Sequence, residues 1–119
     1  MRHICGFTTT TLKEPCEIYI VRNAVEVNIG CLRYGYFWDN TLFMNVLGID
    51  KPYRGQGIGK QAVLVWETEM RAKGFTLVMT STLSNEEAQH FYRRLGYRDA
   101  GCLLLPDEPL EILFTKSLT

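Results

Sequence analysis

A glycine-rich turn in the middle of the chain constrains the fold more than any other feature. The turn reads Tyr-Arg-Gly-Gln-Gly-Ile-Gly-Lys over residues 53–60. A stretch typical of a strand, 43–49, precedes it, and a helical pattern follows it. Glycine places no Cβ in the way of a ligand, and the free N–H groups of a helix's first turn attract an anion. We therefore predict a phosphate-binding turn between a strand and a helix.

Two widespread phosphate-binding patterns do not fit this turn. The P-loop pattern ends in Gly-Lys-Ser/Thr, but Gly59-Lys60 is followed by Gln61, and Arg54 stands where the first glycine belongs. The dinucleotide pattern G-x-G-x-x-G, started at Gly55, requires a glycine where this chain has Lys60. The pattern that does fit is R-x-x-G-x-G, from Arg54 to Gly59.

Length and composition predict one ordinary domain over 1–119. The chain has 119 residues, a formal net charge of zero and a charged fraction of 22%. Lysine and arginine form no run, so we do not expect binding to nucleic acid or to a membrane surface. No apolar run approaches the roughly 20 residues of a membrane span. The N-terminus lacks the apolar core of a secretory signal, which favours a cytoplasmic location.

The cysteines give no sign of a metal site. Cys5, Cys16, Cys31 and Cys102 are scattered along the chain and form no C-x-x-C pair. Zinc ligands are usually more closely spaced, so we expect free thiols and no metal.

Hydrophobic periodicity and turn residues predict an α+β domain in the order β-β-β-α-β-α-β-β. Residues 1–16 have no clear period, and we expect them to form a loose arm or a short edge strand. The strands are predicted over 17–22, 25–31, 41–49, 75–81, 97–105 and 109–116. The first helix is predicted over about 57–73. The second begins with a capping box of Ser84 and Glu87 and ends at Gly96.

The second helix carries another motif, N-x-x-A-x-x-F-Y-x-x-x-G-Y, over residues 85–97. This motif and R-x-x-G-x-G occur in order, separated by one helix and one strand. Together they resemble the GNAT superfamily of N-acyltransferases, and the resemblance covers about 17–118. It implies a mixed twisted β-sheet flanked by helices. It also implies an acetyl-CoA-dependent N-acetyltransferase that transfers the acetyl group directly to a primary amine of a small molecule or peptide.

The resemblance further implies roles for individual residues. The backbone N–H groups that would bind the pyrophosphate of acetyl-CoA belong to Gly55, Gln56, Gly57, Ile58, Gly59 and Lys60, with Arg54 adding charge beside them. The third strand splays from its neighbour in this family, which would free backbone groups of Leu47, Gly48 and Ile49 for the pantetheine arm and the thioester oxygen. Asn85 would hydrogen-bond the pantetheine. Tyr92 would protonate the departing sulfur, because a phenol of pKa about 10 can serve a thiolate whose conjugate acid has a pKa of about 8.5.

Each of these roles has a structural alternative. Tyr92 lies on an apolar stripe and would also fit an ordinary core, Asn85 would also support a turn, and Arg54 would also suit a solvated loop. The aromatic run over 36–38, in a predicted loop over 35–40, fits an acceptor pocket as well as a core. The residues interpreted as core are Trp66 and Phe91. The candidates for a general base, with none preferred, are Glu26, Asp39 and Asp50.

The resemblance breaks down near the N-terminus. The family pattern opens with a strand and one or two helices that form a wall of the acceptor site, whereas only about sixteen residues precede the predicted strand over 17–22 here. We therefore expect an active site that is open on one side or completed by a second subunit in a homodimer. The alternative function is a non-catalytic acyl-CoA-binding or regulatory module that has lost its acceptor site. A structural domain that binds no nucleotide is the third interpretation.

Overall fold

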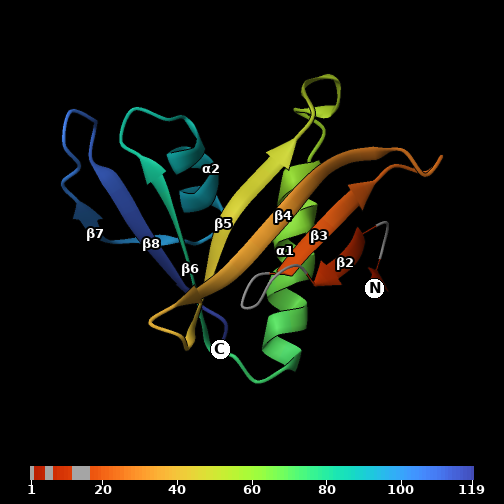
Figure 1. Ribbon diagram of the computed structural model, residues 1–119, viewed down its shortest axis with the longest axis horizontal. Coiled ribbons are helices and arrows are strands. Elements are labelled where there is room, and N and C mark those ends of the chain that lie inside the picture. Colours follow the sequence, from red (N-terminus) through yellow and green to blue (C-terminus); the bar gives the residue numbers. More distant parts are fainter. Residues whose placement is uncertain (1, 5–6, 12–16) are drawn as a thin grey trace.

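The computed structural model describes residues 2–4, 7–11 and 17–119. Its strands form one sheet in the order β1-β2-β3-β4-β5-β6-β8-β7 (Figure 1). The strands are β1 (Arg2–Ile4), β2 (Phe7–Thr11), β3 (Glu17–Arg22), β4 (Asn28–Phe37), β5 (Thr41–Ile49), β6 (Leu77–Leu83), β7 (Arg98–Leu103) and β8 (Glu111–Ser117). The helices are the 3-10 helix η1 (Lys51–Tyr53), α1 (Ile58–Ala72) and α2 (Ala88–Arg94). β5 and β6 pair in parallel and the other described neighbours pair antiparallel, which confirms the predicted mixed α+β sheet.

β1 and β2 lie in the segment for which we expected a loose arm or a short edge strand. β2 pairs antiparallel with β3, and β1 pairs antiparallel with β2. The two strands therefore extend the sheet beyond the strands that periodicity predicted.

The second predicted strand was placed too early. It begins at Asn28 rather than at Val25, because the Oδ1 atom of Asn23 accepts hydrogen bonds from the N–H groups of Val25 and Val27, at 3.1 and 3.0 Å. These bonds hold residues 23–27 in a turn, and a side chain that satisfies backbone donors in this way competes with the sheet ladder. The strand then continues to Phe37, so the first half of the predicted loop over 35–40 is strand.

The predicted capping box is wrong. α2 begins at Ala88, one turn later than expected, and no side chain caps it. The Ser84 N–H instead donates to the Leu110 carbonyl at 2.7 Å, and Glu86 Oε1 accepts from the Leu83 N–H at 2.6 Å. The Ser84 bond ties this turn to the chain before β8, and the helix begins only after the turn.

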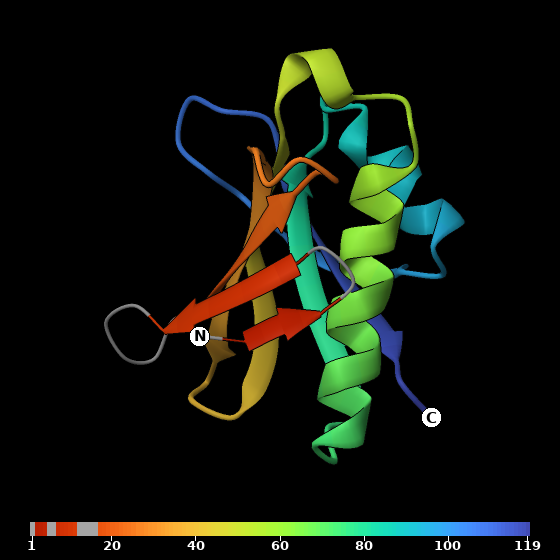
Figure 2. The ribbon, with the colours of Figure 1, turned by 90° about the vertical axis from the view of Figure 1, so that its right-hand side faces the viewer.

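Both α1 and α2 lie on the same side of the sheet (Figure 2). α1 buries Ala62, Val63, Trp66, Glu67 and Met70. Leu42, Met44, Val78 and Phe114 belong to the same core and come from the strands. Because side chains alternate along a strand, Phe43, Ser81 and Leu113 point to the opposite face. We call this the helix-free face, since no described helix covers it.

Gly30 is required where β4 passes close to β5. A Cβ at this position would lie 2.3 Å from the carbonyl oxygen of Gly48. We expect Gly30→Ala to lower the free energy of unfolding by about 1–3 kcal/mol, because the two strands must move apart. The matched control is Gly48→Ala, since a Cβ there meets nothing within 4 Å. Urea unfolding followed by circular dichroism measures both, and equal stabilities for the two variants would contradict the close approach.

Candidate active site

β5 and β6 separate in the middle of the sheet. Their parallel pairing is limited to Leu42 with Val78 and Phe43 with Met79. The register of β4 against β5 then shifts between Arg33 and Tyr34, which leaves Asn45 as an extra residue on β5. Figure 1 shows the C-terminal ends of β5 and β6 diverging beyond this point. Bulges of this kind are common beside active sites because they end a pairing and redirect side chains.

The glycine turn leads into the N-terminus of α1 with its backbone donors free. Gly55 and Gly57 both have a φ of 78°, in the left-handed region that favours glycine, and a Cβ on either would meet nothing within 4 Å. Gln61 is the first residue of α1 whose N–H donates to a backbone carbonyl, that of Gly57, at 3.0 Å. No side chain caps the helix. The N–H groups of Ile58, Gly59 and Lys60 therefore carry the positive end of the helix dipole toward an open space.

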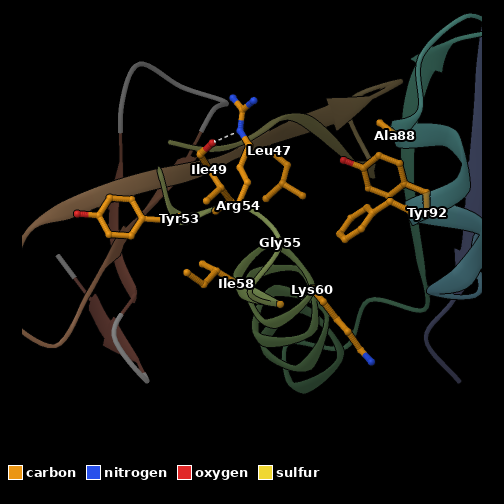
Figure 3. A pocket seen from close by; sticks show the side chains of 12 residues that line it. Leu47, Ile49, Tyr53, Arg54, Gly55, Ile58, Lys60, Ala88 and Tyr92 are labelled. Carbon is orange, nitrogen blue, oxygen red and sulfur yellow. Dashed lines mark hydrogen bonds between the residues drawn. The ribbon is translucent and has the colours of Figure 1, made fainter. Parts of the chain in front are cut away.

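A cavity of about 520 Å³ connects this helix terminus with α2, and we call it the main cavity. Figure 3 shows Leu47 and Ile49 of β5 on one side, Ile58 of α1 on the other and Tyr92 of α2 at one end. A Cβ on Gly59 would reach the Phe91 ring at 3.6 Å, so glycine keeps this cavity open between the two helices. The predicted site residues that line it are Leu47, Ile49, Arg54, Gly55, Gly57, Ile58, Gly59, Lys60 and Tyr92.

Other predicted site residues lie elsewhere. Gln56 and Asn85 are exposed, and the described walls of the main cavity do not include them. Gly48 lines a neighbouring pocket beside β4, together with Arg54. Phe91, which we interpreted as core, is half-buried and forms part of the cavity wall. Trp66 is fully buried, as predicted.

Arg54 is held by the strand that precedes the turn. Its Nε donates a hydrogen bond to the carbonyl oxygen of Ile49 at 2.7 Å (Figure 3). The carbonyl of Ile49 was one of the backbone groups expected to be free for a ligand, and in this structure Arg54 occupies it. Figure 3 shows the Lys60 side chain pointing away from Leu47 and Tyr92.

Tyr92 lies where the main cavity meets a second space. It is 6% exposed, and its ring packs edge-on against Phe91 and Tyr97 at 5.1 and 5.5 Å between centroids. Burial raises the pKa of Tyr92 to about 12, and a hydrogen bond with the Thr80 side chain opposes this rise. The phenol is therefore protonated at neutral pH and can act as a proton donor.

The second space is a polar pocket of about 340 Å³ in the gap between β5 and β6. It shares Leu47, Ala88 and Tyr92 with the main cavity. Two carboxylates, Glu86 and Glu111, also line it. Sequence reasoning missed both, because neither belongs to a recognised motif and the pocket forms only when β5, β6 and β8 come together.

The three general-base candidates lie away from these walls. Glu26 is in the turn before β4, where its carboxylate pairs with Arg22 at 3.3 Å. Asp39 lies in the exposed turn after β4, and Asp50 lies beside Arg54 at the end of β5. The described linings of the main cavity and the polar pocket include none of the three.

No group of three or more His, Cys, Asp or Glu residues is placed to hold a metal ion in the described part of the chain. Cys31 and Cys102 are free thiols, whereas Cys5 and Cys16 lie outside the described residues. No described helix is both long enough and apolar enough to span a bilayer.

Comparison with known proteins agrees with this geometry. The family model described as acetyltransferase (GNAT) family matches residues 2–97. A relative from Bacillus subtilis, named uncharacterized protein YyaT, is 30% identical over 110 residues, which cover 92% of this chain and 71% of the relative.

Two solved structures show the same fold. An acetyltransferase from Bacillus cereus has a TM-score of 0.72 and is 26% identical in sequence. The match covers 88% of this chain and 76% of the Bacillus cereus chain. A GNAT family acetyltransferase from Elizabethkingia anophelis, solved with acetyl-CoA bound, has a TM-score of 0.77 and is 17% identical in sequence. The match covers 96% of this chain and 99% of the Elizabethkingia anophelis chain. The predicted fold class and the predicted resemblance are both confirmed.

Proposed function

The chain belongs to the GNAT acetyltransferase family, and we propose that it transfers an acetyl group from acetyl-CoA directly to a primary amine on a small molecule or peptide. One observation carries the proposal: a single cavity of about 520 Å³ extends from the uncapped N-terminus of α1 to Tyr92. An anion-binding terminus and a buried proton donor are what transfer from the thioester of a nucleotide cofactor requires.

The residues present fit the pyrophosphate of acetyl-CoA. The donors are the backbone N–H groups of 55–60, and the space that a Cβ on Gly55 or Gly57 would enter is empty. Arg54 adds positive charge beside the turn while it holds Ile49. Leu47, Ile49 and Phe91 give the cavity an apolar wall suited to the pantetheine arm. In this proposal Gly48 contributes backbone contacts, and Asn85 binds the pantetheine from the turn before α2.

Bound acetyl-CoA would supply an acetyl thioester at the Tyr92 end of the cavity. The acceptor ammonium releases one proton to solvent, and its nitrogen then forms the bond to the acetyl carbonyl carbon as the bond to sulfur breaks. The Tyr92 hydroxyl donates its proton to the departing sulfur, and it recovers a proton from the new amide nitrogen. The balance is one acetylated amine, one free thiol and one proton. Alignment and charge stabilisation would supply most of the rate enhancement.

Thermal unfolding with and without acetyl-CoA tests the cofactor site. At about a hundred times its dissociation constant, acetyl-CoA should add about 2.7 kcal/mol to the free energy of unfolding. Gly57→Glu should lose this shift, because a carboxylate at the helix N-terminus repels the pyrophosphate.

The matched control is Gly74→Glu at the other end of α1. Gly74 has a φ of 96° and no atom within 4 Å of an added Cβ, so the backbone strain is similar while the cavity is untouched. This variant should keep the acetyl-CoA shift. A folded wild-type protein without a shift at millimolar acetyl-CoA would overturn the proposal.

Release of free thiol in the presence of amines separates an enzyme from an acyl-CoA-binding module. Turnover supports the enzyme, whereas a thermal shift without turnover on any amine supports the binding module.

The proposal also includes the expected cytoplasmic location and the expected homodimer. The exposed side chains of Leu104 and Leu110 in the loop before β8 are consistent with a contact between two copies.

A further inference from the structure

The helix-free face of the sheet carries a second large hollow, which we call the aromatic groove. Its volume is about 500 Å³, similar to that of the main cavity. Tyr36, Phe37 and Phe43 line it on the side of β4 and β5, and Leu103 and Leu113 line it on the side of β7 and β8. The rings of Phe37 and Phe43 stack at 6.3 Å between centroids. The groove therefore offers flat apolar walls of the kind that bind an aromatic or aliphatic body.

The polar pocket joins the aromatic groove to the main cavity. It shares Asn45, Ser81 and Glu111 with the groove, and Leu47, Ala88 and Tyr92 with the main cavity. Its lining thus comes from both faces of the sheet. This is possible because β5 and β6 stop pairing after Phe43, so the gap between them leads from one face to the other.

Three polar groups in this passage are available to a ligand. The Ser81 hydroxyl donates to Oε2 of Glu111 at 2.6 Å, and within the described residues no partner is recorded for the other carboxylate oxygen, Oε1. Thr82 is 4% exposed and lines the polar pocket, yet its hydroxyl has no described hydrogen-bond partner. The side-chain amide of Asn45 lies at the bulge between the groove and the pocket. A buried polar group without a partner is costly, so a ligand that bonds to Thr82 would be favoured.

The charge of the passage selects the ligand. Glu86 and Glu111 are acidic, and the described linings of the polar pocket and the aromatic groove contain no lysine or arginine. Glu86 already accepts the Leu83 N–H through Oε1, whereas Glu111 lies at the junction of the two spaces. A cation is therefore favoured at Glu111, with an apolar body extending into the groove.

We infer that the polar pocket and the aromatic groove form the acceptor site, and that the acceptor is an amine with an aromatic or bulky apolar body whose ammonium binds Glu111. This inference rests on the proposed function, because it names the acceptor of that reaction. The amine enters from the helix-free face, and the ammonium donates to Oε1 of Glu111. Its nitrogen then lies in the gap between β5 and β6, on the same passage as Tyr92.

The experiment compares 2-phenylethylamine with ethylamine in the thiol-release assay. The wild-type protein should favour 2-phenylethylamine by at least about tenfold in kcat/KM, since the added ring is buried in the groove. Phe43→Ala should reduce the preference for 2-phenylethylamine, because the ring loses one aromatic wall of the groove. Glu111→Gln should lower kcat/KM for both amines by about 10–100-fold, because a neutral amide replaces the charged partner.

The matched control for the charge is Glu108→Gln, in the exposed turn before β8, which should behave as wild type. All variants should retain the thermal shift with acetyl-CoA, since none lies in the main cavity. Turnover of amines with no preference for 2-phenylethylamine, or with no effect of Glu111→Gln, would overturn the acceptor site and leave the proposed function standing. If acetyl-CoA produced no thermal shift in the wild-type protein, the proposed function itself would be overturned.

A binding measurement keeps the inference testable without turnover. Amide resonances of Ser81, Leu103 and Leu113 should shift when 2-phenylethylamine is added to wild-type protein, and they should not shift in Glu111→Gln. Unchanged resonances at millimolar 2-phenylethylamine, with acetyl-CoA present, would overturn the acceptor site.

Discussion

Tyr92→Phe is expected to lower kcat by about 10²–10⁴-fold, the usual contribution of a positioned general acid. The substitution removes only the hydroxyl, so the ring keeps its contacts with Phe91, Tyr97 and Phe114. Acetyl-CoA should therefore still produce its full thermal shift. Steady-state thiol release measures kcat, and the melting experiment shows that the cofactor still binds.

Tyr53→Phe is the matched control for this prediction. Tyr53 lines the same main cavity, and Figure 3 shows it at the end opposite Tyr92. Removing its hydroxyl should leave kcat nearly unchanged. An unchanged kcat in Tyr92→Phe would show that Tyr92 is a packing residue only, and equal losses in the two variants would show that the effect is not specific to the Tyr92 hydroxyl.

The pKa of Tyr92 also sets a pH dependence. Because burial raises the pKa to about 12, the donor stays protonated and kcat should not fall through Tyr92 ionisation below about pH 11. The pKa of Tyr92 in the folded state lies above the ordinary value of 10.0. The protonated Tyr92 hydroxyl therefore makes its full contribution to the free energy of unfolding below pH 10. That contribution is lost as the pH rises from 10 toward 12. Urea midpoints should therefore fall less over this range in Tyr92→Phe than in wild type.

Glu67→Ala is expected to lower the free energy of unfolding by about 3–5 kcal/mol, the usual cost of removing one partner of a buried ion pair. Glu67 is 2% exposed on the core side of α1. Its Oε1 accepts from Lys116 Nζ and its Oε2 from the Tyr97 hydroxyl, both at 2.8 Å. The substitution leaves a largely buried ammonium without its counter-charge. Burial and the nearby Glu67 hold the pKa of Tyr97 well above its ordinary value, so its hydroxyl remains a donor that would also lose its acceptor.

Urea unfolding followed by the fluorescence of the buried Trp66 measures this loss. Glu87→Ala is the control, because the Glu87 side chain is exposed and its carboxylate lies 4.0 Å from Nε2 of His90, which is also exposed. An exposed pair of this kind should change stability by about 0.5 kcal/mol or less. A loss below about 1 kcal/mol for Glu67→Ala would mean that Lys116 and Tyr97 find other partners.

Local chemistry made much of the fold predictable. The glycine turn was recognisable because it needs a particular backbone shape, and Gly55 and Gly57 do have positive φ values. The helix after it was predicted over about 57–73 and runs over Ile58–Ala72. Where a polar side chain had two possible backbone partners, prediction failed. The Asn23 side chain delayed the start of β4, and the Glu86 carboxylate accepts the Leu83 N–H in the turn where the cap of α2 was predicted.

Packing over long sequence separations was not predictable. Hydrophobic periodicity did not predict that the charged Glu67 is buried on α1 together with Trp66 and Met70. The partners that make this possible, Tyr97 and Lys116, lie 30 and 49 residues further along the chain. A periodicity that counts only apolar residues cannot detect a carboxylate whose charge is balanced from another element.

The sequence by itself determined the glycine turn, the order of the main helices and strands over 17–119 and the presence of Tyr92 on the second helix, because each depends on neighbours within a few turns of chain. The tertiary structure alone decided which groups meet in the gap between β5 and β6. The parallel pairing of β5 with β6 ends at Phe43, just before the bulge at Asn45, and Glu111 of β8 lies beside Ser81 of β6. Register between distant strands is set by the whole core, so the passage from Tyr92 to Glu111 exists only once the sheet has assembled.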